Sequence, residues 1–452
     1  MALSRVFVAN RGEIAVRIVR ACQALGLDTV VGVSDADRDS LAAELAGRSV
    51  VLGPAPARVS YLNANLVVHA AKATGCDGLH PGYGFLSESP ALAGLCEREG
   101  IAFVGPQADT IERLGDKLTA RAIAIEAGVP IVPGSDRIRS AAEARCSAAS
   151  VGYPVLTKAS AGGGGRGMFV AQSDADIDER FERASAEAEA AFGDGALFVE
   201  RFVEDARHVE VQIVGDGEGA VVHCGERDCS VQRRFQKMVE EAPAAALPAE
   251  ARTLIHEAAC RLAGHLNYRS AGTVEFLYDV ARNEAYFIEA NVRIQVEHPV
   301  TEEITGIDLI EEQLRIAGGR GLSVAQEDIA LSGHAIECRI NAEAPERDFA
   351  PSPGLIDVWR VPEGHGIRLD SHCRAGTFVP PFYDSMIAKL IVRAGDRAEA
   401  VARMGDALES FEVSGIDTNL AFQTRLVRHP DFVANKLNTR WLEDVFMPAP
   451  MH

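Results

Sequence analysis

The stretch KASAGGGGRGM, residues 158–168, contains four consecutive glycines and an arginine shortly after the apolar run 154–156. Ordering a glycine costs more conformational entropy than ordering any other residue, so this tract either stays disordered or lets the backbone approach a ligand closely. A second strand-like run follows in MFVAQS, and Ser173 or Asp174 can then cap a helix. The pattern predicts a strand, a glycine loop, a strand and a helix.

Two nucleotide-binding loops must be compared with this pattern. Gly162, Gly164 and Gly167 match GxGxxG, but that fingerprint needs a helix directly after the loop, and here a strand follows. No GxxxxGK[ST] loop occurs in the chain. A glycine flap on a hairpin can close over phosphates, with Lys158 as a point charge. The alternative is a solvated hairpin tip, which four glycines between Lys158 and Arg166 make less favoured.

Short apolar runs alternate with helical stretches over roughly the first hundred residues. The strand-like runs are 5–9, 29–33, 49–52 and 102–104, and residues 13–24 show the apolar repeat of an amphipathic helix. This alternation predicts a doubly wound parallel sheet. Its first turn, ANRGEIA, lacks the full dinucleotide fingerprint.

Two breaks divide the rest of the chain. A predicted helix that contains Lys117 leads into AGVPIVPGS, whose prolines and glycines indicate a linker, and a second break falls at 318–323. Strands within 333–343 and 383–395, with a helix over 397–409, then predict a mixed α+β unit. The expected fold class is therefore multidomain, with α/β and α+β units.

The composition excludes several classes of protein. With 452 residues, 47% hydrophobic, the chain is long enough for two to four packed domains. A formal net charge of −20 argues against a general nucleic-acid or anionic-membrane surface. Nine cysteines without a CxxC pair indicate reduced thiols. Without a signal-peptide pattern or a membrane-length apolar stretch, the cytoplasm is the expected location.

Acidic side chains recur on two predicted neighbouring strands, TVEFLYD and AYFIEANVRIQVEHPVTE, joined by a short turn. Because strand side chains alternate, Glu289, Asn291 and Arg293 share one face, and Glu275 from the first strand completes the set. Two carboxylates and an amide oxygen are hard ligands suited to Mg²⁺, which bridges carboxylates to nucleotide phosphates.

The alternative is a merely solvated strand face, which does not explain why apolar residues alternate so regularly with the acids. Those residues, predicted to turn to the opposite face, are Ile288, Ala290 and Val292. If the strand keeps its pleat, Gln295 and Glu297 continue the polar face, with Glu297 as a candidate base beside the anion-binding Arg293. His298, a lone histidine before a proline, receives no role.

Over nearly its whole length the chain resembles the biotin carboxylases of the ATP-grasp superfamily, in particular the biotin carboxylase subunit of acetyl-CoA carboxylase. The matching motifs are ANRGEIAVRI, HPGYGFLSE, GDK, KASAGGGGRGM, RHVEVQI, ERDCSVQRRFQK, FIEANVRIQVEHPVTE, GHAIECRINAE and PPFYDSMIAKL. The resemblance implies a Rossmann-like N-terminal domain at 1–113, an ATP-grasp domain at 114–330 with a lid at about 131–203, and a C-terminal domain at 331–452.

The resemblance also implies roles for individual residues. The ATP-binding set is Lys117, Lys158, Gly164, Gly165, Glu200, Arg201, Phe202, Val203, His208, Glu275 and Glu289. The metal set, for two ions of Mg²⁺ or Mn²⁺, is Glu275, Glu289 and Asn291. The bicarbonate set is Lys237, Arg293, Gln295 and the backbone of Val296. Glu297 matches the base that deprotonates bicarbonate, Arg339 the group that stabilises the biotin enolate, and Tyr83 a segment near biotin.

The implied reaction follows from charge. Bicarbonate is a poor electrophile, so ATP phosphorylates it to carboxyphosphate while the metal and lysines offset charge on the transferred group. Carboxyphosphate decomposes to CO₂ and phosphate, the phosphate takes the N1 proton of biotin, and N1 attacks CO₂. The fixed charge of Arg339 lowers the barrier to the enolate, and closure of the glycine lid excludes water.

The expected partners follow from a motif that is absent. Biotin is attached to a lysine in a motif close to AMKM, and no MKM occurs in the chain, so the expected partner is a separate biotin carboxyl carrier protein with carboxyltransferase subunits. By family analogy the chain is a homodimer in the first half-reaction of acetyl-CoA carboxylase, in fatty-acid synthesis.

Three departures and three alternatives accompany this interpretation. Phe235 replaces a usual histidine or asparagine, Thr157 an aliphatic residue, and Ala161 a glycine; the expected effect is at most lowered affinity for ATP.

The same half-reaction could serve propionyl-CoA, pyruvate, 2-oxoglutarate or urea carboxylation. A non-catalytic ATP-binding regulatory protein, or another ATP-grasp ligase, would not need Arg339 and the bicarbonate-binding residues.

Overall fold

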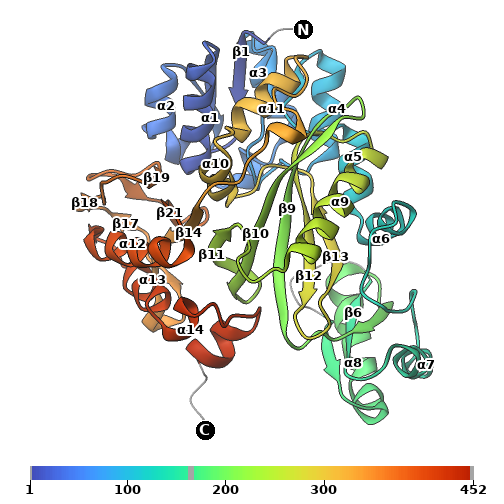
Figure 1. Ribbon diagram of the computed structural model, residues 1–452. Helices are drawn as coiled ribbons and strands as arrows, with labels where there is room; N and C mark the ends of the chain where they lie inside the picture. Colours follow the sequence, from blue (N-terminus) through green and yellow to red (C-terminus); the bar gives the residue numbers. More distant parts are fainter. Residues whose placement is uncertain (1–2, 161–166, 448–452) are drawn as a thin grey trace.

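The computed structural model describes residues 3–160 and 167–447 (Figure 1). Two residues predicted to lie in the glycine lid, Gly164 and Gly165, and the departure at Ala161 therefore fall outside the described residues. Within the described ranges, every helix is too short or too polar to span a bilayer.

The N-terminal unit contains the predicted parallel sheet, in the strand order β3-β2-β1-β4-β5. Its strands are β1 (Arg5–Val8), β2 (Asp28–Ser34), β3 (Ser49–Gly53), β4 (Gly78–His80) and β5 (Ala102–Phe103), and its helices α1 (Gly12–Ala24), α2 (Leu41–Ala46), α3 (Ala64–Ala73) and α4 (Pro90–Glu99). The order reverses between β1 and β4. In such sheets ligands bind outside the carboxyl ends of the strands at this reversal, and Tyr83 follows β4 there.

The helix predicted to contain Lys117 is two helices, α5 (Ala108–Gly115) and α6 (Lys117–Glu126). The chain turns at Asp116, whose backbone is extended and whose Oδ1 accepts a hydrogen bond from the backbone N–H of Thr119 at 2.8 Å. This is an N-cap, so the prediction of one helix was wrong because Asp116 starts a new one. Lys117 lies exposed in the first turn of α6.

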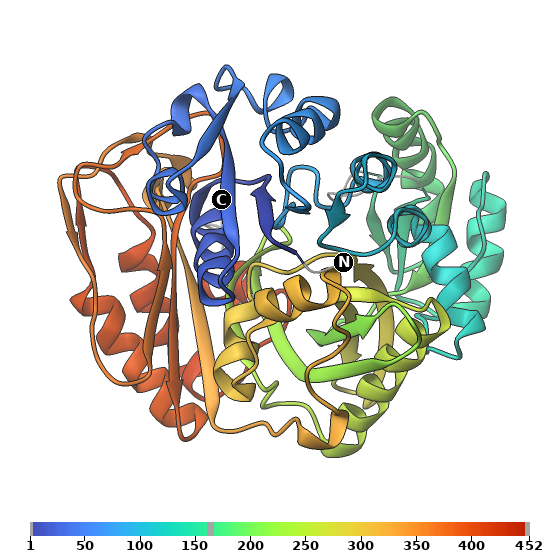
Figure 2. The same cartoon turned by 90° about the horizontal axis from the view of Figure 1, so that it is seen from above.

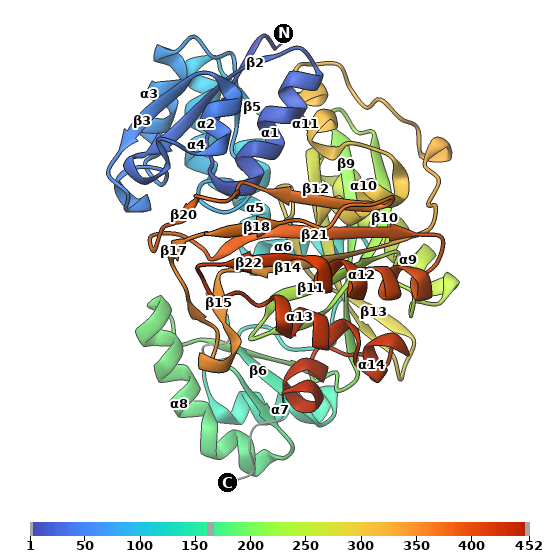
Figure 3. The same cartoon turned by 90° about the vertical axis from the view of Figure 1, so that its left-hand side faces the viewer.

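A single eight-stranded antiparallel sheet forms the centre of the molecule, in the order β13-β12-β9-β10-β11-β14-β21-β19. Its strands are β9 (Ala206–Asp216), β10 (Val221–Arg233), β11 (Gln236–Ala242), β12 (Arg269–Asp279), β13 (Glu284–Asn291), β14 (His334–Asn341), β19 (Ile367–Ser371) and β21 (Met386–Ala394). The strands after the second predicted break thus extend the same sheet, because β14 pairs with β11. Figure 3 shows them crossing between the N-terminal unit and the lid unit.

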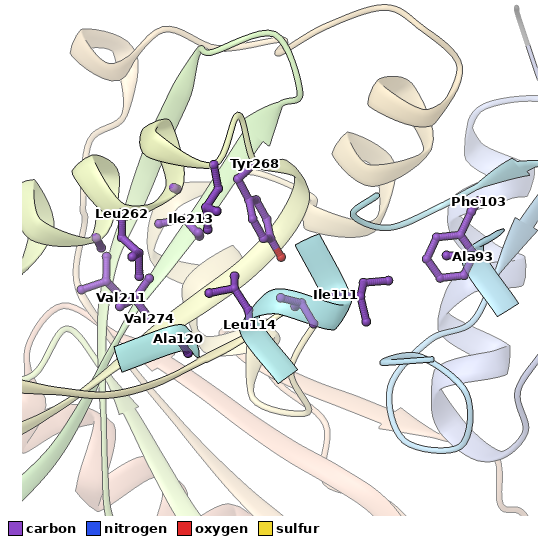
Figure 4. Close-up of a cluster of buried hydrophobic side chains, with 14 of the residues drawn as sticks. Ala93, Phe103, Ile111, Leu114, Ala120, Val211, Ile213, Leu262, Tyr268 and Val274 are labelled. Atoms are coloured by element: carbon purple, nitrogen blue, oxygen red, sulfur yellow. The ribbon is translucent and has the colours of Figure 1, made fainter. Parts of the chain in front are cut away.

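Helices cover this sheet and complete the core. They are α9 (Ala249–His265), α10 (His298–Thr305), α11 (Leu309–Ala317), α12 (Arg397–Ser410), α13 (Leu420–Val427) and α14 (Pro430–Val433). Figure 4 shows one part of the core, where Ile111 and Leu114 of α5 lie beside Tyr268 and Ile213 of the central sheet region. Burying a side chain of this size contributes about 1.5–3 kcal/mol, which fixes the N-terminal unit against the sheet.

The lid unit has the predicted strand, loop, strand and helix. Strands β6 (Val155–Ala159), β7 (Phe169–Ala171) and β8 (Leu197–Arg201) form an antiparallel sheet, packed against α7 (Ala141–Val151) and α8 (Asp174–Phe192). Ser173 caps α8 in a capping box with Asp176. The unit projects to one side of the molecule, away from the C-terminal strands (Figure 2).

Candidate functional site

The predicted acidic face lies on the β12–β13 hairpin. Glu275 is directly opposite Glu289, and Thr273 is opposite Asn291, so these side chains point to the same side of the sheet. Asn291 Nδ2 donates a hydrogen bond to Glu275 Oε1 at 2.8 Å. The predicted alternation therefore places two carboxylates and an amide together.

The regular pleat does not continue as predicted. Strand β13 ends at Asn291, and Ile288 is the extra residue at a bulge, where it is 38% exposed, while Val292 is buried in the core. Gln295 and Glu297 come back to the site by a turn instead of along a strand. Gln295 Nε2 donates to Thr273 Oγ1 at 3.1 Å, and Glu297 is the N-cap residue of α10.

Lys237 lies at the centre of the site, on β11. Its Nζ is 2.6 Å from Glu210 Oε2, 3.0 Å from Glu275 Oε1 and 2.7 Å from Glu297 Oε1. Burial would lower the pKa of this ammonium, but Cys229 and the glutamates around it raise the pKa well above its ordinary value. Lys237 is therefore a fixed positive charge that joins the acidic hairpin to Glu297.

Glu297 is bound on both sides by cations. Its Oε1 accepts from Lys237, and its Oε2 accepts from Arg339 Nη2 at 3.0 Å. Burial alone would raise the pKa of this carboxyl, yet Lys237, Arg339 and Arg227 hold it well below its ordinary range. Glu297 is thus ionised near neutral pH, as a proton acceptor must be.

Arg293 contacts residues of its own chain segment and Glu88 of the N-terminal unit. Its Nη1 donates to Gln295 Oε1 at 2.8 Å, its Nη2 to Asn291 Oδ1 at 3.4 Å, and its Nε lies 3.4 Å from Glu88 Oε2. The neighbouring carbonyl of Val296 accepts a hydrogen bond from the buried Lys389 Nζ at 2.9 Å. Arg293, Gln295 and Val296 therefore lie on one short segment, which Lys389 holds in place and which leads to Glu297 beside Lys237.

Several of the predicted nucleotide residues lie on the lid strands β6 and β8 and on the segment that follows β8. Lys158 on β6 forms an ion pair with Glu200 on β8, and Arg201 Nη1 donates to the hydroxyl of Tyr286 at 3.0 Å. Val203 is buried against Val132, Ala206 and Tyr286.

The segment between β8 and β9 is fixed by its backbone, since the N–H of Phe202 donates to the carbonyl of Pro154 at 3.1 Å. His208 Nε2 lies 2.7 Å from Glu275 Oε2. Burial opposes its protonated form, but the Glu275 carboxylate outweighs burial and raises the pKa of His208. His208 thereby connects the nucleotide side to the acidic hairpin.

Tyr83 approaches the cluster from the N-terminal unit. Its hydroxyl donates to Glu13 Oε1, which also lies 3.1 Å from Lys389 Nζ. Lys389 is opposite Arg339 on the paired strands β21 and β14. The predicted biotin-side residues, Tyr83 and Arg339, are therefore linked through Glu13 and Lys389.

Sequence reasoning gave no role to three buried residues of this site. They are Glu210, Arg227 and Glu240. Glu210 accepts hydrogen bonds from Lys237 and Arg227. Arg227 Nη1 also donates to Gln212 Oε1 and Thr301 Oγ1 at 2.8 Å each, and Glu240 accepts from Arg339. The alternation of His208, Glu210 and Gln212 in RHVEVQI was a usable signal for Glu210.

The side chains of the acidic hairpin fit a divalent cation of the Mg²⁺ type. Glu275 and Glu289 are paired across two strands, and the pKa of Glu289 is raised by burial and by the charge of Glu275, which Lys117 only partly offsets. A cation would relieve this repulsion. Carboxylate and amide oxygens from Glu275, Glu289 and Asn291 are the hard donors that Mg²⁺ prefers.

Two of the sequence departures lie in the described residues. Phe235 is 70% exposed at the β10–β11 turn, with φ +65°, and the preceding Arg234 also has positive φ. A bulky residue with positive φ is strained. Thr157 is fully buried on β6, and its hydroxyl has no hydrogen-bond partner among the described residues.

Three consecutive segments of the chain match models of known protein families. Residues 2–111 match the family model described as biotin carboxylase, N-terminal domain, and residues 337–444 match the biotin carboxylase C-terminal domain. Residues 116–325 match the carbamoyl-phosphate synthase L chain, ATP binding domain.

Full-length relatives and solved structures extend this comparison. Biotin carboxylase 1 of Bacillus subtilis strain 168 is 48% identical over 442 residues, 98% of each chain. The small subunit of 2-oxoglutarate carboxylase from Hydrogenobacter thermophilus is 46% identical over 441 residues, 97% of this chain and 93% of that protein. The biotin carboxylase domain dimer of the 2-oxoglutarate carboxylase from the same organism, solved with MgADP, ADP and bicarbonate, superposes with a TM-score of 0.91 at 46% identity over 98% of each chain.

Proposed function

Because the chain belongs to the biotin carboxylase family of ligase-type carboxylases, we propose that it uses ATP and bicarbonate to carboxylate biotin on a carrier protein. One observation carries this proposal above the others. The Glu297 carboxylate bonds Lys237 with one oxygen and Arg339 with the other, so a single proton acceptor lies between the bicarbonate side and the biotin side.

Bicarbonate binds, in this proposal, beside Lys237, Arg293, Gln295 and the backbone of Val296. The two cationic side chains bind its oxygens, and Glu297 takes its proton. Glu297 is ionised before bicarbonate arrives because Lys237 and Arg339 depress its pKa. When an anion engages Lys237, this stabilisation weakens and Glu297 becomes a stronger base.

Biotin binds between Arg339 and Tyr83. The Arg339 guanidinium is permanently charged, and burial lowers its pKa less than Glu240 and Glu297 raise it. Its Nη1, which has no hydrogen-bond partner among the described residues, can donate to the ureido oxygen and stabilise the enolate that forms when N1 loses its proton. Phosphate released from carboxyphosphate takes that proton, and N1 then attacks CO₂.

The nucleotide binds between the lid unit and the acidic hairpin. Lys117 and Lys158 hold the phosphates, Gly164 and Gly165 belong to the lid over them, His208 faces the nucleotide, and residues 200–203 line the adenine site. One or two Mg²⁺ or Mn²⁺ ions held by Glu275, Glu289 and Asn291 would offset charge on the transferred phosphoryl group. The MgADP and bicarbonate in the Hydrogenobacter thermophilus structure support this assignment.

We propose that the chain serves acetyl-CoA carboxylase in fatty-acid synthesis, as a homodimer with a carrier protein and carboxyltransferase subunits. A second candidate is a pyruvate or 2-oxoglutarate carboxylase, favoured by relatives of both names at 45–46% identity. The nine cysteines are all free thiols, which supports the cytoplasm. We also propose domain divisions near residues 113 and 330, a proposal supported by the turn at Asp116 and the loop after α11.

The transfer of labelled carbon tests this function. With ATP, Mg²⁺, labelled bicarbonate and free biotin, the chain should form labelled carboxybiotin. The Arg339→Gln variant should keep bicarbonate-dependent ATP cleavage but form carboxybiotin about 100-fold more slowly. If the wild-type chain forms no carboxybiotin while it cleaves ATP, the proposed acceptor is wrong.

A further inference from the structure

Arg339 is held from behind by a glutamate that does not reach the site. Glu240 Oε1 accepts from Arg339 Nε at 2.7 Å and also lies close to Nη2. The Glu240 side chain is 0% exposed, whereas that of Arg339 is 19% exposed. Among the described residues, the Glu240 carboxylate hydrogen-bonds only to the Arg339 guanidinium.

The orientation of the Arg339 guanidinium matters for the proposed chemistry. Glu240 occupies Nε, and Glu297 occupies Nη2 at 3.0 Å. Two fixed acceptors on one planar guanidinium set both its position and its plane, because the donors of arginine form a rigid fork. A misplacement of about 1 Å of such a group costs on the order of 100-fold in rate.

A second buried glutamate lies beside Glu240 on the next strand. Glu337 on β14 is directly opposite Glu240 on β11 and is 0% exposed. Neither of its carboxyl oxygens has a protein hydrogen-bond partner among residues 3–160 and 167–447. Its neighbours on the same face, Ala242, Ala335 and Ile391, pack against α10 in an apolar cluster.

The charges that face this pair come from four elements. They are Glu240 and Lys237 on β11, Arg339 on β14, Lys389 on β21 and Glu297 at the start of α10. Lys389 Nζ is already bound to Glu13 and the Val296 carbonyl. Burial raises the pKa of Glu240 to about 7, although the charge of Arg339 offsets part of this rise. Burial also raises the pKa of Glu337 well above its ordinary value.

We infer that Glu240 is a positioning residue that fixes the Arg339 guanidinium for biotin, and that Glu337 beside it is a neutral carboxylic acid outside the catalytic machinery. A third carboxylate next to Arg339, without a further cation, would be an uncompensated buried charge, and buried acids of this kind bind a proton instead. The inference rests on the proposed function, since it assigns a residue to the biotin step.

The two glutamates give a matched pair of variants. Glu240→Gln should lower kcat/KM for free biotin by about tenfold or more, with KM for ATP and bicarbonate-dependent ATP cleavage without biotin within about twofold of wild type. Glu337→Gln should leave all three within about twofold, because it replaces a neutral acid with a neutral amide of the same shape.

A double-mutant cycle separates positioning from a merely structural role. If Glu240 acts through Arg339, Glu240→Gln should cost nothing more in the Arg339→Gln background. An equal loss in both backgrounds overturns the inference. Should Glu240→Gln fail to fold, Glu240→Asp, which keeps the charge at a shorter reach, is measured in the same cycle with the same expectation.

Infrared spectroscopy reads the protonation of Glu337 without any assay of activity. The wild type minus Glu337→Gln difference spectrum at pH 7 should contain the absorption of a protonated carboxyl group. A carboxylate absorption in its place, or a Glu337→Gln loss as large as that of Glu240→Gln, contradicts the assignment. If wild type shows no response to biotin at all, the proposed function fails, and the infrared result still decides the state of Glu337.

Discussion

Glu210 Oε1 accepts a hydrogen bond from Arg227 Nε at 2.5 Å, and both side chains are 0% exposed. The other oxygen of Glu210 binds Lys237 Nζ at 2.6 Å. Arg227 in turn donates to Gln212 and to Thr301 on α10. This chain of buried contacts fixes the lysine that the proposal assigns to bicarbonate.

Removing the Glu210 charge should therefore damage both stability and activity. In Glu210→Gln the buried Arg227 loses its carboxylate, and breaking a buried pair in this way costs about 3–5 kcal/mol. We expect a lower unfolding midpoint in urea and a drop of about tenfold or more in bicarbonate-dependent ATP cleavage. Wild-type values for both would contradict the support of Lys237 by Glu210.

Arg293→Ala should abolish ATP cleavage that depends on bicarbonate and biotin. The alanine leaves Gln295 without its guanidinium partner and removes an anion-binding charge beside Lys237. The control is Arg360→Ala, since Arg360 is 73% exposed in a surface pair with Glu412, and such pairs contribute little. Steady-state phosphate release compares the two, and activity that survives Arg293→Ala rejects the assignment of Arg293.

Phe235→His should lower KM for ATP. Phe235 is exposed at a strained turn two residues before Lys237, and a polar ring there can form a hydrogen bond that a phenyl ring cannot. One such bond contributes about 1 kcal/mol, or about fivefold in affinity. Phe235→Leu, which adds no polar atom, serves as the control. A KM for ATP that is the same in wild type and Phe235→His counts against a nucleotide contact at this position.

Acid should weaken the contact between the central sheet and α12. Glu241 accepts from Arg397 Nε at 2.7 Å and lies 2.9 Å from His334 Nε2. Burial would raise its pKa, but His334 and Arg397 outweigh burial and lower the pKa from 4.5 to about 2. Because the folded-state pKa is depressed, this stabilisation is fully present above about pH 4.5 and is lost as the pH falls toward 2.

The Glu241→Gln variant isolates that contribution. Above pH 5 it should be less stable than wild type by on the order of 3 kcal/mol, and the difference should shrink as the pH falls. Urea unfolding of both proteins at several pH values between 7 and 3 measures it. A difference that stays constant over this range would show that the Glu241 carboxylate is not responsible.

Much of the fold could be predicted from local patterns. Four strands of the first sheet, the strand–loop–strand of the lid and the acidic face of the β12–β13 hairpin follow from local patterns within a few residues, whereas β4 was not predicted. The break at Asp116 was missed because a helical apolar repeat continues on both sides of the N-cap. The joining of β14 to β11 was missed because pairing between strands about a hundred residues apart leaves no periodic signal.

The site, too, contains residues that local patterns predicted and residues that they missed. Glu275, Glu289 and Asn291 lie in the regularly paired part of one hairpin, so side-chain alternation predicted the shared face that the structure has. Glu297 reached the site by a turn that no pleat predicts. Glu337 lies in the strand predicted within 333–343 and Glu240 in no predicted element, and only the pairing of β11 with β14 shows that two buried carboxyl groups lie side by side next to Arg339.

The most direct measurement of the central claim is phosphate release from ATP and Mg²⁺, with bicarbonate and free biotin each present or omitted. Release should be slow with bicarbonate alone, rise when biotin is added, and fall to background when bicarbonate is omitted or Mg²⁺ is chelated. Release that ignores bicarbonate, or that biotin does not stimulate, would contradict a site in which Glu297 connects bicarbonate activation to biotin carboxylation.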